Sequence, residues 1–263
     1  MARAEARATT SCDNVPGLSR RIGSLAVAVY GGKGNSSRVY QHRFLTQASK
    51  VVRPGERVLD AGAGRAPYRR LFEHAQYETA DFMAMSTMKY RQPDYVCDLS
   101  AIPVEDGRFD HVLLTQVLEH LPEPGRVLAE LHRVLAPGGR LWLTAPLFYA
   151  EHQAPYDFYR YTQYGMRHVL ETAGFEVVSL EWMEGYLGTL SYQVRVMSKV
   201  LPARARDYGG GPRGTAVALA ARTAKRLGRP AADLLARLDV RFKFVDRGMP
   251  KNYQVVARKP TPA

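Results

Sequence analysis

A glycine loop with an acid before it lies at residues 58–66 (VLDAGAGRA). Glycine lets a ligand approach the backbone, and a helix that begins after such a loop offers free N–H groups. Dinucleotide-binding enzymes use glycines in the same place, so the loop alone does not identify the ligand. Asp60, two residues before Gly62, suits a cationic ligand better than a pyrophosphate. The third glycine of the dinucleotide fingerprint would fall at Pro67, which also disfavours that class.

Two further acids end the next apolar segments. Asp81 lies seventeen residues beyond Gly64, where a carboxylate can accept hydrogen bonds from both hydroxyls of a ribose. Asp98 ends the following segment, where it can accept from the exocyclic amine of an adenine. Taken alone, each of these acids would be interpreted as a helix cap or a turn residue. Three acids in register with a glycine loop favour one ligand crevice, and S-adenosylmethionine, with its ammonium and sulfonium, suits it.

Two histidines could take a proton in such a crevice, because histidine titrates near neutral pH. His120 follows the strongly apolar segment 109–115, and its alternative role is to hydrogen-bond backbone at a helix entry. His152 lies in a tyrosine-rich loop with Asp157 and Arg160. That acid and arginine could instead form a buried pair that pins the loop.

Short apolar segments alternate with amphipathic ones, which predicts βαβ units and a mainly parallel sheet covered on both faces. Strands are expected at 57–60, 77–81, 95–98, 109–115, 140–145, 175–182 and 253–257. Helices are expected from Ser36 or Ser37 to about 52, then at 67–74, from Pro122 or Pro124 to 135, at 164–173 and at 190–201. Residues 214–240 are expected to hold one or two helices, split near Gly228 and Pro230.

The stretch 55–182 resembles the class I S-adenosylmethionine-dependent methyltransferases. The similarity is to their small-molecule, methyltransferase type 11-like branch, which includes the ubiquinone and menaquinone biosynthesis methyltransferases. It rests on VLDAGAG, the strand-end Asp81, DLSAIPVEDGRFDHVLLTQVLEHLPEP, LAELHRVLAPGGRLWLTAP and ETAGFEVVSLE. The resemblance implies a Rossmann-like α/β fold with a seven-stranded, mostly parallel sheet and an antiparallel last strand. N-terminal helices and a helical insertion before the last strand complete the expected architecture.

The resemblance also implies roles for individual residues. Asp60, Gly62 and Gly64 would hold the methionine part of the cofactor, Asp81 the ribose, and Asp98 with Leu99 the adenine. Phe82 would pack on the adenine, and Gln116 would line the methionine side. The candidate catalytic residues are His120, His152 and Asp157.

A metal is not expected. Some quinone O-methyltransferases bind magnesium through an E-x-x-E-H motif after the fourth strand. Here the motif reads Gln116-Val-Leu-Glu119-His120, so its first acid is missing.

Four segments are expected: 1–54, helical or flexible; 55–183, the cofactor-binding core; 184–248, a helical insertion; and 249–263, the last strand and tail. Residues 1–55 hold nine Lys/Arg and two Asp/Glu, and residues 186–263 hold sixteen and four. These basic flanks could contact nucleic acid, a membrane surface or a phosphorylated substrate, or could be solubilising charge alone. The insertion could cap the substrate, form a homodimer interface or be a solvated appendage.

The two cysteines, Cys12 and Cys97, form no C-x-x-C pair, which fits a reducing compartment. No secretion signal or membrane span is expected, so we expect a cytoplasmic enzyme.

The sequence therefore predicts an S-adenosylmethionine-dependent methyltransferase for a hydroxyl or amine of a small molecule, natural product or sugar. The alternative is a nucleic-acid or lipid-linked substrate bound by the basic flanks. Residues 115–118 (TQVL) lack the motif of the amino-methylating DNA enzymes, which disfavours nucleic acid. A nucleotide-binding dehydrogenase and a non-catalytic partner protein are disfavoured by Asp60 and by the intact acids.

Overall fold

The computed structural model describes residues 35–82 and 92–262. Cys12 and most of the expected N-terminal segment lie outside these residues. The strands are β1 Arg57–Ala61, β2 Gln76–Asp81, β3 Tyr95–Val96, β4 Phe109–Thr115, β5 Leu135–Pro146, β6 Glu176–Trp182 and β7 Asn252–Arg258. The α-helices are α2 Ser36–Val51, α3 Pro124–Val134, α4 Gln163–Thr172, α5 Tyr186–Val200 and α6 Gly211–Phe242. Short 3₁₀ helices are η1 Arg69–Phe72, η2 Leu118–His120 and η3 Ala205–Tyr208.

All seven strands form one sheet in the order β3-β2-β1-β4-β5-β7-β6. Strands β1 to β5 pair in parallel, and β7 is antiparallel to both β5 and β6. The predicted Rossmann-like sheet with an antiparallel last strand is therefore confirmed. Because the order reverses beside β1, the carboxyl ends of β1 and β4 flank the crevice where such folds bind ligands.

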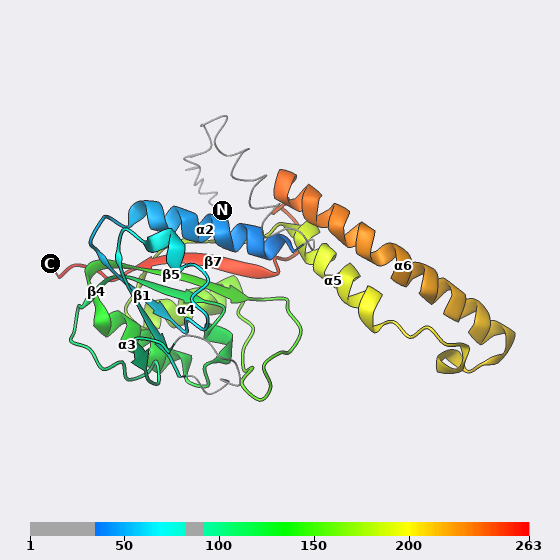
Figure 1. Cartoon of the computed structure of the whole chain (residues 1–263), viewed down its shortest axis with the longest axis horizontal. Helices are drawn as coiled ribbons and strands as arrows, with labels where there is room; N and C mark the ends of the chain where they lie inside the picture. Colours follow the sequence, from blue (N-terminus) through cyan, green and yellow to red (C-terminus); the bar gives the residue numbers. More distant parts are fainter. Residues whose placement is uncertain (1–34, 83–91, 263) are drawn as a thin grey trace, which may run out of the picture.

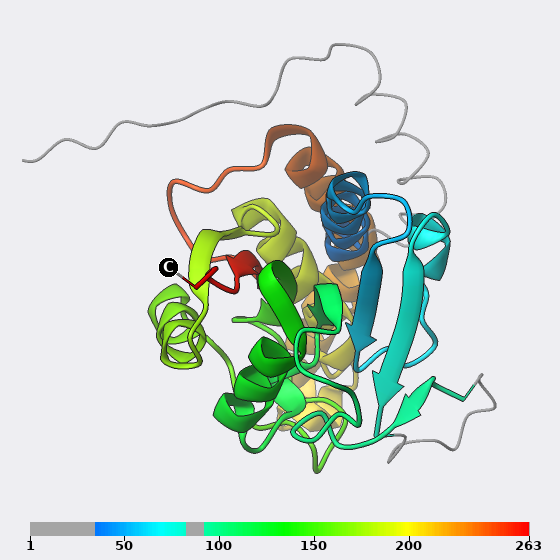
Figure 2. The ribbon, with the colours of Figure 1, turned by 90° about the vertical axis from the view of Figure 1, so that its left-hand side faces the viewer.

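Helices cover both faces of the sheet, which is why its central strands are apolar throughout. Helix α2 packs Phe44, Leu45 and Ala48 against Val58 and Trp142 on one face. Helices α3 and α4 cover the other face (Figure 2). Their buried residues are Val127, Leu128, Leu131, Val134, Met166 and Leu170.

Helices α5 and α6 form a long hairpin that projects beyond the sheet (Figure 1). We call residues 186–242 the arm. Small residues of α6 face α5, and Gly228 is needed there because a Cβ would lie 2.7 Å from the Ser198 Cβ. The arm is anchored to the core through Tyr40 of α2, whose hydroxyl donates to the Asp239 carbonyl at 2.7 Å.

Several sequence expectations about helices were wrong. Helix α6 runs unbroken through Gly228 and Pro230, because packing against α5 supports the helix where proline removes a backbone hydrogen bond. Ser36 and Ser37 do not cap α2 but lie buried inside it, and Asn35 occupies the N-cap position. The expected helix 67–74 is only the 3₁₀ turn η1.

The helix before β5 ends at Val134, so Leu135 belongs to the strand instead of the helix. No described helix combines the length and hydropathy that a membrane span needs.

Candidate functional site

The glycine loop connects β1 to η1 with left-handed backbone at both glycines. Gly62 has φ +73°, and a Cβ there would lie 2.5 Å from a Val117 methyl group. Gly64 has φ +51°, and nothing lies within 4 Å of the place where its Cβ would be. The N–H of Gly62 donates to the Ala80 carbonyl at 2.8 Å, which ties the loop to β2. The loop therefore requires glycine for its conformation, and at Gly64 it leaves space beside the backbone.

Asp81 closes the loop from the end of β2. Its carboxylate accepts a hydrogen bond of 2.8 Å from the Gly64 N–H. The acid and the glycine that the sequence pattern links across seventeen residues are thus in direct contact. This bond holds the strand-end acid at the rim of the open space beside Gly64.

Asp60 is nearly covered, at 4% exposed, on the α2 face of β1. Its carboxylate accepts a hydrogen bond from the Tyr77 hydroxyl. Burial raises the pKa of Asp60 to about 6, while the Tyr77 hydrogen bond and the Arg69 guanidinium oppose that rise. A cationic group bound nearby would stabilise the ionised carboxylate and lower this pKa.

The remaining predicted cofactor residues lie around the ends of β2 and β3. Phe82 is 61% exposed and follows Asp81 directly. Asp98 is exposed, whereas Leu99 is buried. The Asp98 carboxylate accepts from the Ser100 N–H at 2.8 Å, so it also fills the role of a turn residue. This hydrogen bond lowers the pKa of Asp98.

Gln116 follows β4 with a φ of +57°, a conformation unusual for a residue with a side chain. Its N–H donates to the Thr144 carbonyl at 2.8 Å, and its side-chain amide to the Thr144 hydroxyl at 3.3 Å. The chain turns here from β4 into η2. The turn places the Glu119 and His120 that follow at the carboxyl edge of the sheet.

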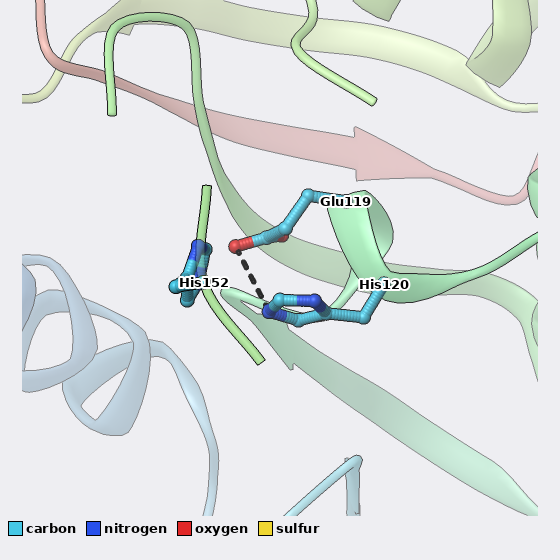
Figure 3. A group of neighbouring side chains, drawn as sticks. All are labelled: Glu119, His120 and His152. Atoms are coloured by element: carbon cyan, nitrogen blue, oxygen red, sulfur yellow. Dashed lines mark ion pairs between the residues drawn. The ribbon is translucent and has the colours of Figure 1, made fainter. Parts of the chain in front are cut away.

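Glu119, His120 and His152 form a cluster in which η2 meets the loop after β5 (Figure 3). The rings of His120 and His152 pack edge to face, with centroids 4.6 Å apart. His120 Nε2 lies 3.8 Å from a Glu119 carboxylate oxygen. His120 Nδ1 lies 2.5 Å from the Tyr156 carbonyl oxygen. A carbonyl can only accept, so Nδ1 carries the proton and Nε2 is a bare acceptor.

Glu119 is fully buried, and among the described residues neither of its carboxylate oxygens has a hydrogen-bond partner. Burial raises the pKa of Glu119 to about 7, against the opposing effect of the Arg160 charge. Burial also lowers the pKa of His120. A buried carboxyl without a partner is costly for folding, and such groups concentrate where proton transfer is needed.

The loop that carries His152 is held by an ion pair. Both carboxylate oxygens of Asp157 bind the Arg160 guanidinium, at 2.7 and 2.8 Å. Arg160 also donates to the carbonyls of Tyr149 and Ala150, each at 3.1 Å. The same carboxylate accepts from the His152 N–H at 2.8 Å and lies 3.4 Å from His152 Nδ1. The Arg160 guanidinium holds the pKa of Asp157 well below its usual range.

These contacts give Asp157 a clear part in positioning His152. His152 Nδ1 faces two acceptors, Asp157 and the Ala150 carbonyl at 3.2 Å, so that nitrogen carries the proton. Nε2 is then the nitrogen that can act as a base. The His152 side chain is 27% exposed and that of His120 is 12% exposed.

The cluster is also the candidate place for a metal ion. One ligand atom from each of Glu119, His120 and His152 lies within 4.8 Å of the others. Ligands at about 2.1 Å from one ion lie closer together than that, so the side chains would have to move inward. The expectation of no metal stays a prediction.

A separate hollow of about 300 Å³ lies at the opposite edge of the sheet, between Arg53, His111 and Arg140. It contains none of the predicted site residues. Its wall includes the ion-paired Glu56, which binds Arg53 and contacts His111. We therefore place the functional site at the carboxyl edge.

Comparison with known protein families identifies this core. Residues 59–143 match the family described as methyltransferase domain. Residues 59–143 therefore carry a methyltransferase domain. For this part of the chain the match confirms the predicted S-adenosylmethionine-dependent class. The matched range includes Gly62 and Gly64, the acids Asp60, Asp81 and Asp98, and Glu119 and His120, and it stops before His152.

Curated relatives align with the methyltransferase domain and its surroundings. A demethylmenaquinone methyltransferase of Renibacterium salmoninarum is 35% identical over 106 residues, which cover 38% of this chain and 44% of that protein. The ubiquinone/menaquinone biosynthesis C-methyltransferase UbiE of Bordetella parapertussis is 28% identical over 182 residues, which cover 64% and 68%. A transposon Tn4556 protein of Streptomyces fradiae is 32% identical over 98 residues, which cover 37% and 25%. The chain thus spans less than half the length of two of these relatives.

Solved structures of methyltransferases also align with most of the chain. The Burkholderia thailandensis 1,6-didemethyltoxoflavin-N1-methyltransferase, with bound 1,6-didemethyltoxoflavin and S-adenosylhomocysteine, is 18% identical to it. The alignment covers 92% of this chain and 87% of that chain, with a TM-score of 0.49.

Two contributors to the site were not chosen from the sequence. Glu119 was visible beside His120, but it was considered only as part of an incomplete metal motif. Tyr77, the partner of Asp60, was expected only as a strand residue. Nothing in the sequence around Tyr77 indicated that its hydroxyl would reach Asp60 on the neighbouring strand.

Proposed function

We propose that this chain transfers a methyl group from S-adenosylmethionine to a hydroxyl or amine of a small molecule, natural product or sugar. The observation that carries the proposal is the direct bond between Asp81 and the left-handed glycine loop, with a histidine cluster at the same edge of the sheet. Curated relatives named as methyltransferases for menaquinone and ubiquinone biosynthesis support a small acceptor.

The residues present fit the cofactor. The open space beside Gly64 admits a ligand close to the backbone, and Asp81 at its rim can accept from ribose hydroxyls. Asp60 would complement the ammonium group electrostatically, behind the loop. Phe82, Asp98 and Leu99 would surround the adenine, and Gln116 the methionine side. When bound, S-adenosylmethionine supplies a methyl group already activated by its sulfonium.

The chain's own task is to align the acceptor and to remove its proton. His152 is the more exposed ring, and its Nδ1 is fixed by Asp157 and the Ala150 carbonyl, so Nε2 is the candidate base. His120 lies behind it with Glu119, and these two groups would adjust the charge around His152. Asp157 acts as a positioning residue, because its carboxylate is committed to Arg160 and the His152 backbone.

The direct test is S-adenosylhomocysteine release from S-adenosylmethionine in the presence of hydroxylated quinones, sugars and phenolic natural products. The proposal predicts acceptor-dependent release that the Asp81→Ala variant loses and the surface variant Asp106→Ala keeps. Release that never depends on an acceptor across all three classes would contradict the small-molecule assignment. Methylation of nucleic acid instead would establish the alternative.

A further inference from the structure

Helix α6 has three faces, and within the part of the chain that the structure describes only one of them packs against other elements. Its inner face packs on α5 through small residues. The other two faces are exposed along most of the length of the arm (Figure 1). One of these is apolar and the other is basic.

The apolar face follows helical spacing. Leu227, Ala231, Leu234 and Leu238 recur at i, i+4, i+7 and i+11, and Ala216 and Ala220 extend the face toward the tip. Leu227 is 60% exposed and Leu234 is 57% exposed. Solvated helices rarely carry such large apolar side chains in a row without a partner.

The basic face lies beside the apolar one. It presents five exposed arginines: Arg222, Arg226, Arg229, Arg237 and Arg241. Among the described residues, no carboxylate lies within ion-pair distance of any of these five. This stretch of helix holds two acids: Asp233 is already paired with Arg195 of α5, and Asp239 is fully buried on the inner face. The face therefore carries a net positive charge that none of the described residues neutralises.

We infer that the arm lies on an anionic membrane surface, with the apolar face of α6 in the headgroup boundary and the arginines on lipid phosphates. An exposed apolar stripe flanked by arginines is the pattern of a helix that lies in the plane of a membrane interface. A second copy of this chain fits less well, because it would bring arginine rows of equal charge together. Nucleic acid would use the arginines but leave the leucines without a partner.

The base of the arm adjoins the candidate acceptor side. Tyr192 of α5 stacks on Tyr149, with ring centroids 4.9 Å apart, and its hydroxyl accepts from the Ala150 N–H at 3.0 Å. Tyr149 in turn packs against the His152 ring, at 5.0 Å. A membrane-bound arm would hold the His152 loop close to the lipid surface.

The test is sedimentation of the full chain with vesicles of pure phosphatidylcholine and of phosphatidylcholine with a quarter phosphatidylglycerol. Binding is expected only to the anionic vesicles and should weaken in high salt. Replacing Arg226, Arg229 and Arg237 by glutamine should reduce the partition coefficient by about fivefold per arginine. The double variant Leu227→Gln/Leu234→Gln should reduce it by at least about tenfold.

Matched controls lie on the core. Arg126→Gln/Arg167→Gln removes exposed arginines from α3 and α4, and Val178→Gln removes an exposed apolar side chain from β6. Both controls should bind the vesicles as the unmodified chain does. Circular dichroism and thermal unfolding of every variant establish that the arm is folded.

Three results would overturn the inference. Folded protein that ignores the anionic vesicles would do so, as would arm variants that bind no more weakly than the controls. Sedimentation velocity that shows a dimer dissociated by Leu227→Gln/Leu234→Gln, without vesicle binding, would assign the apolar face to a second copy.

Discussion

The two sides of the crevice are built in different ways. The cofactor side is a backbone structure: two left-handed glycines fix the loop, and the strand-end Asp81 binds one of them. The acceptor side is a side-chain structure, in which Glu119 and His120 meet His152 from a loop about thirty residues later. Hydrogen bonds close the first side, whereas the second side keeps buried polar atoms that have no hydrogen-bond partner within residues 35–82 and 92–262. One side is suited to hold a ligand firmly, and the other to change its protonation.

The sharpest test of the acceptor side is turnover. We expect His152→Ala to lower kcat by about 10²- to 10⁴-fold, the usual contribution of a general base. His120→Ala should have a smaller effect, because its Nε2 is covered. The exposed His168→Ala on α4 is the control. The measurement is S-adenosylhomocysteine release with an acceptor found by screening. Near-normal turnover in both cluster variants would exclude a histidine base.

The buried carboxyl of Glu119 predicts that the stability of the folded chain depends on pH. Its pKa of about 7 in the folded chain exceeds the ordinary carboxyl value, so the unfolded chain releases this proton first as pH rises. The free energy of unfolding should therefore fall between about pH 4.5 and pH 7 and then level off. Asp60, with a pKa of about 6, contributes in the same direction.

Glu119→Gln should remove the contribution of Glu119 to this decrease in the free energy of unfolding, which is on the order of 1–3 kcal/mol at pH 8. Urea unfolding at pH 5 and pH 8 measures the difference, with the exposed Glu123→Gln as the control. An equal pH dependence in Glu119→Gln and the unmodified chain would show that Glu119 is not held protonated.

On the cofactor side, Asp81→Ala should weaken S-adenosylhomocysteine binding by at least about tenfold, the effect of losing hydrogen bonds to a charged group. Isothermal titration calorimetry measures the affinity, and Asp106→Ala, at an 80% exposed side chain, serves as control. Unchanged affinity in Asp81→Ala would mean that the carboxylate only holds the glycine loop and does not contact the cofactor.

The same contrast explains which parts of the site could be predicted from the sequence. Gly62, Gly64 and Asp81 act through local backbone chemistry, so their spacing indicated both the loop and the sheet edge. The positions of the strands followed from apolar segments bounded by turns, whereas the antiparallel direction of β7 was implied only by the resemblance to the methyltransferases. Glu119, His120 and His152 come together because the loop after β5 folds back over η2. Sequence periodicity predicts helices and strands but not the path of such a loop.

The helix errors have the same origin. Pro230 and Gly228 are local signals for a break, but tertiary packing against α5 overrides them. Ser36 and Ser37 are residue types that often cap helices, yet they form the first turn of α2, with Ser36 buried beside Gly188 of the arm and Ser37 beside Lys251, the residue before β7. The Lys251 ammonium, for example, donates to the Ser37 hydroxyl at 2.5 Å.

The central claim is that the glycine loop holds the cofactor against its backbone. Calorimetric titration with S-adenosylhomocysteine of Gly64→Ala and Gly55→Ala tests it most directly. Both glycines have left-handed φ and open space at the Cβ position, so both variants carry left-handed backbone strain, but Gly55 lies in the turn before β1. We predict that Gly64→Ala loses at least about a hundredfold in affinity, beyond the strain that both share, while Gly55→Ala binds normally. Equal affinities in the two folded variants would contradict a cofactor at this loop.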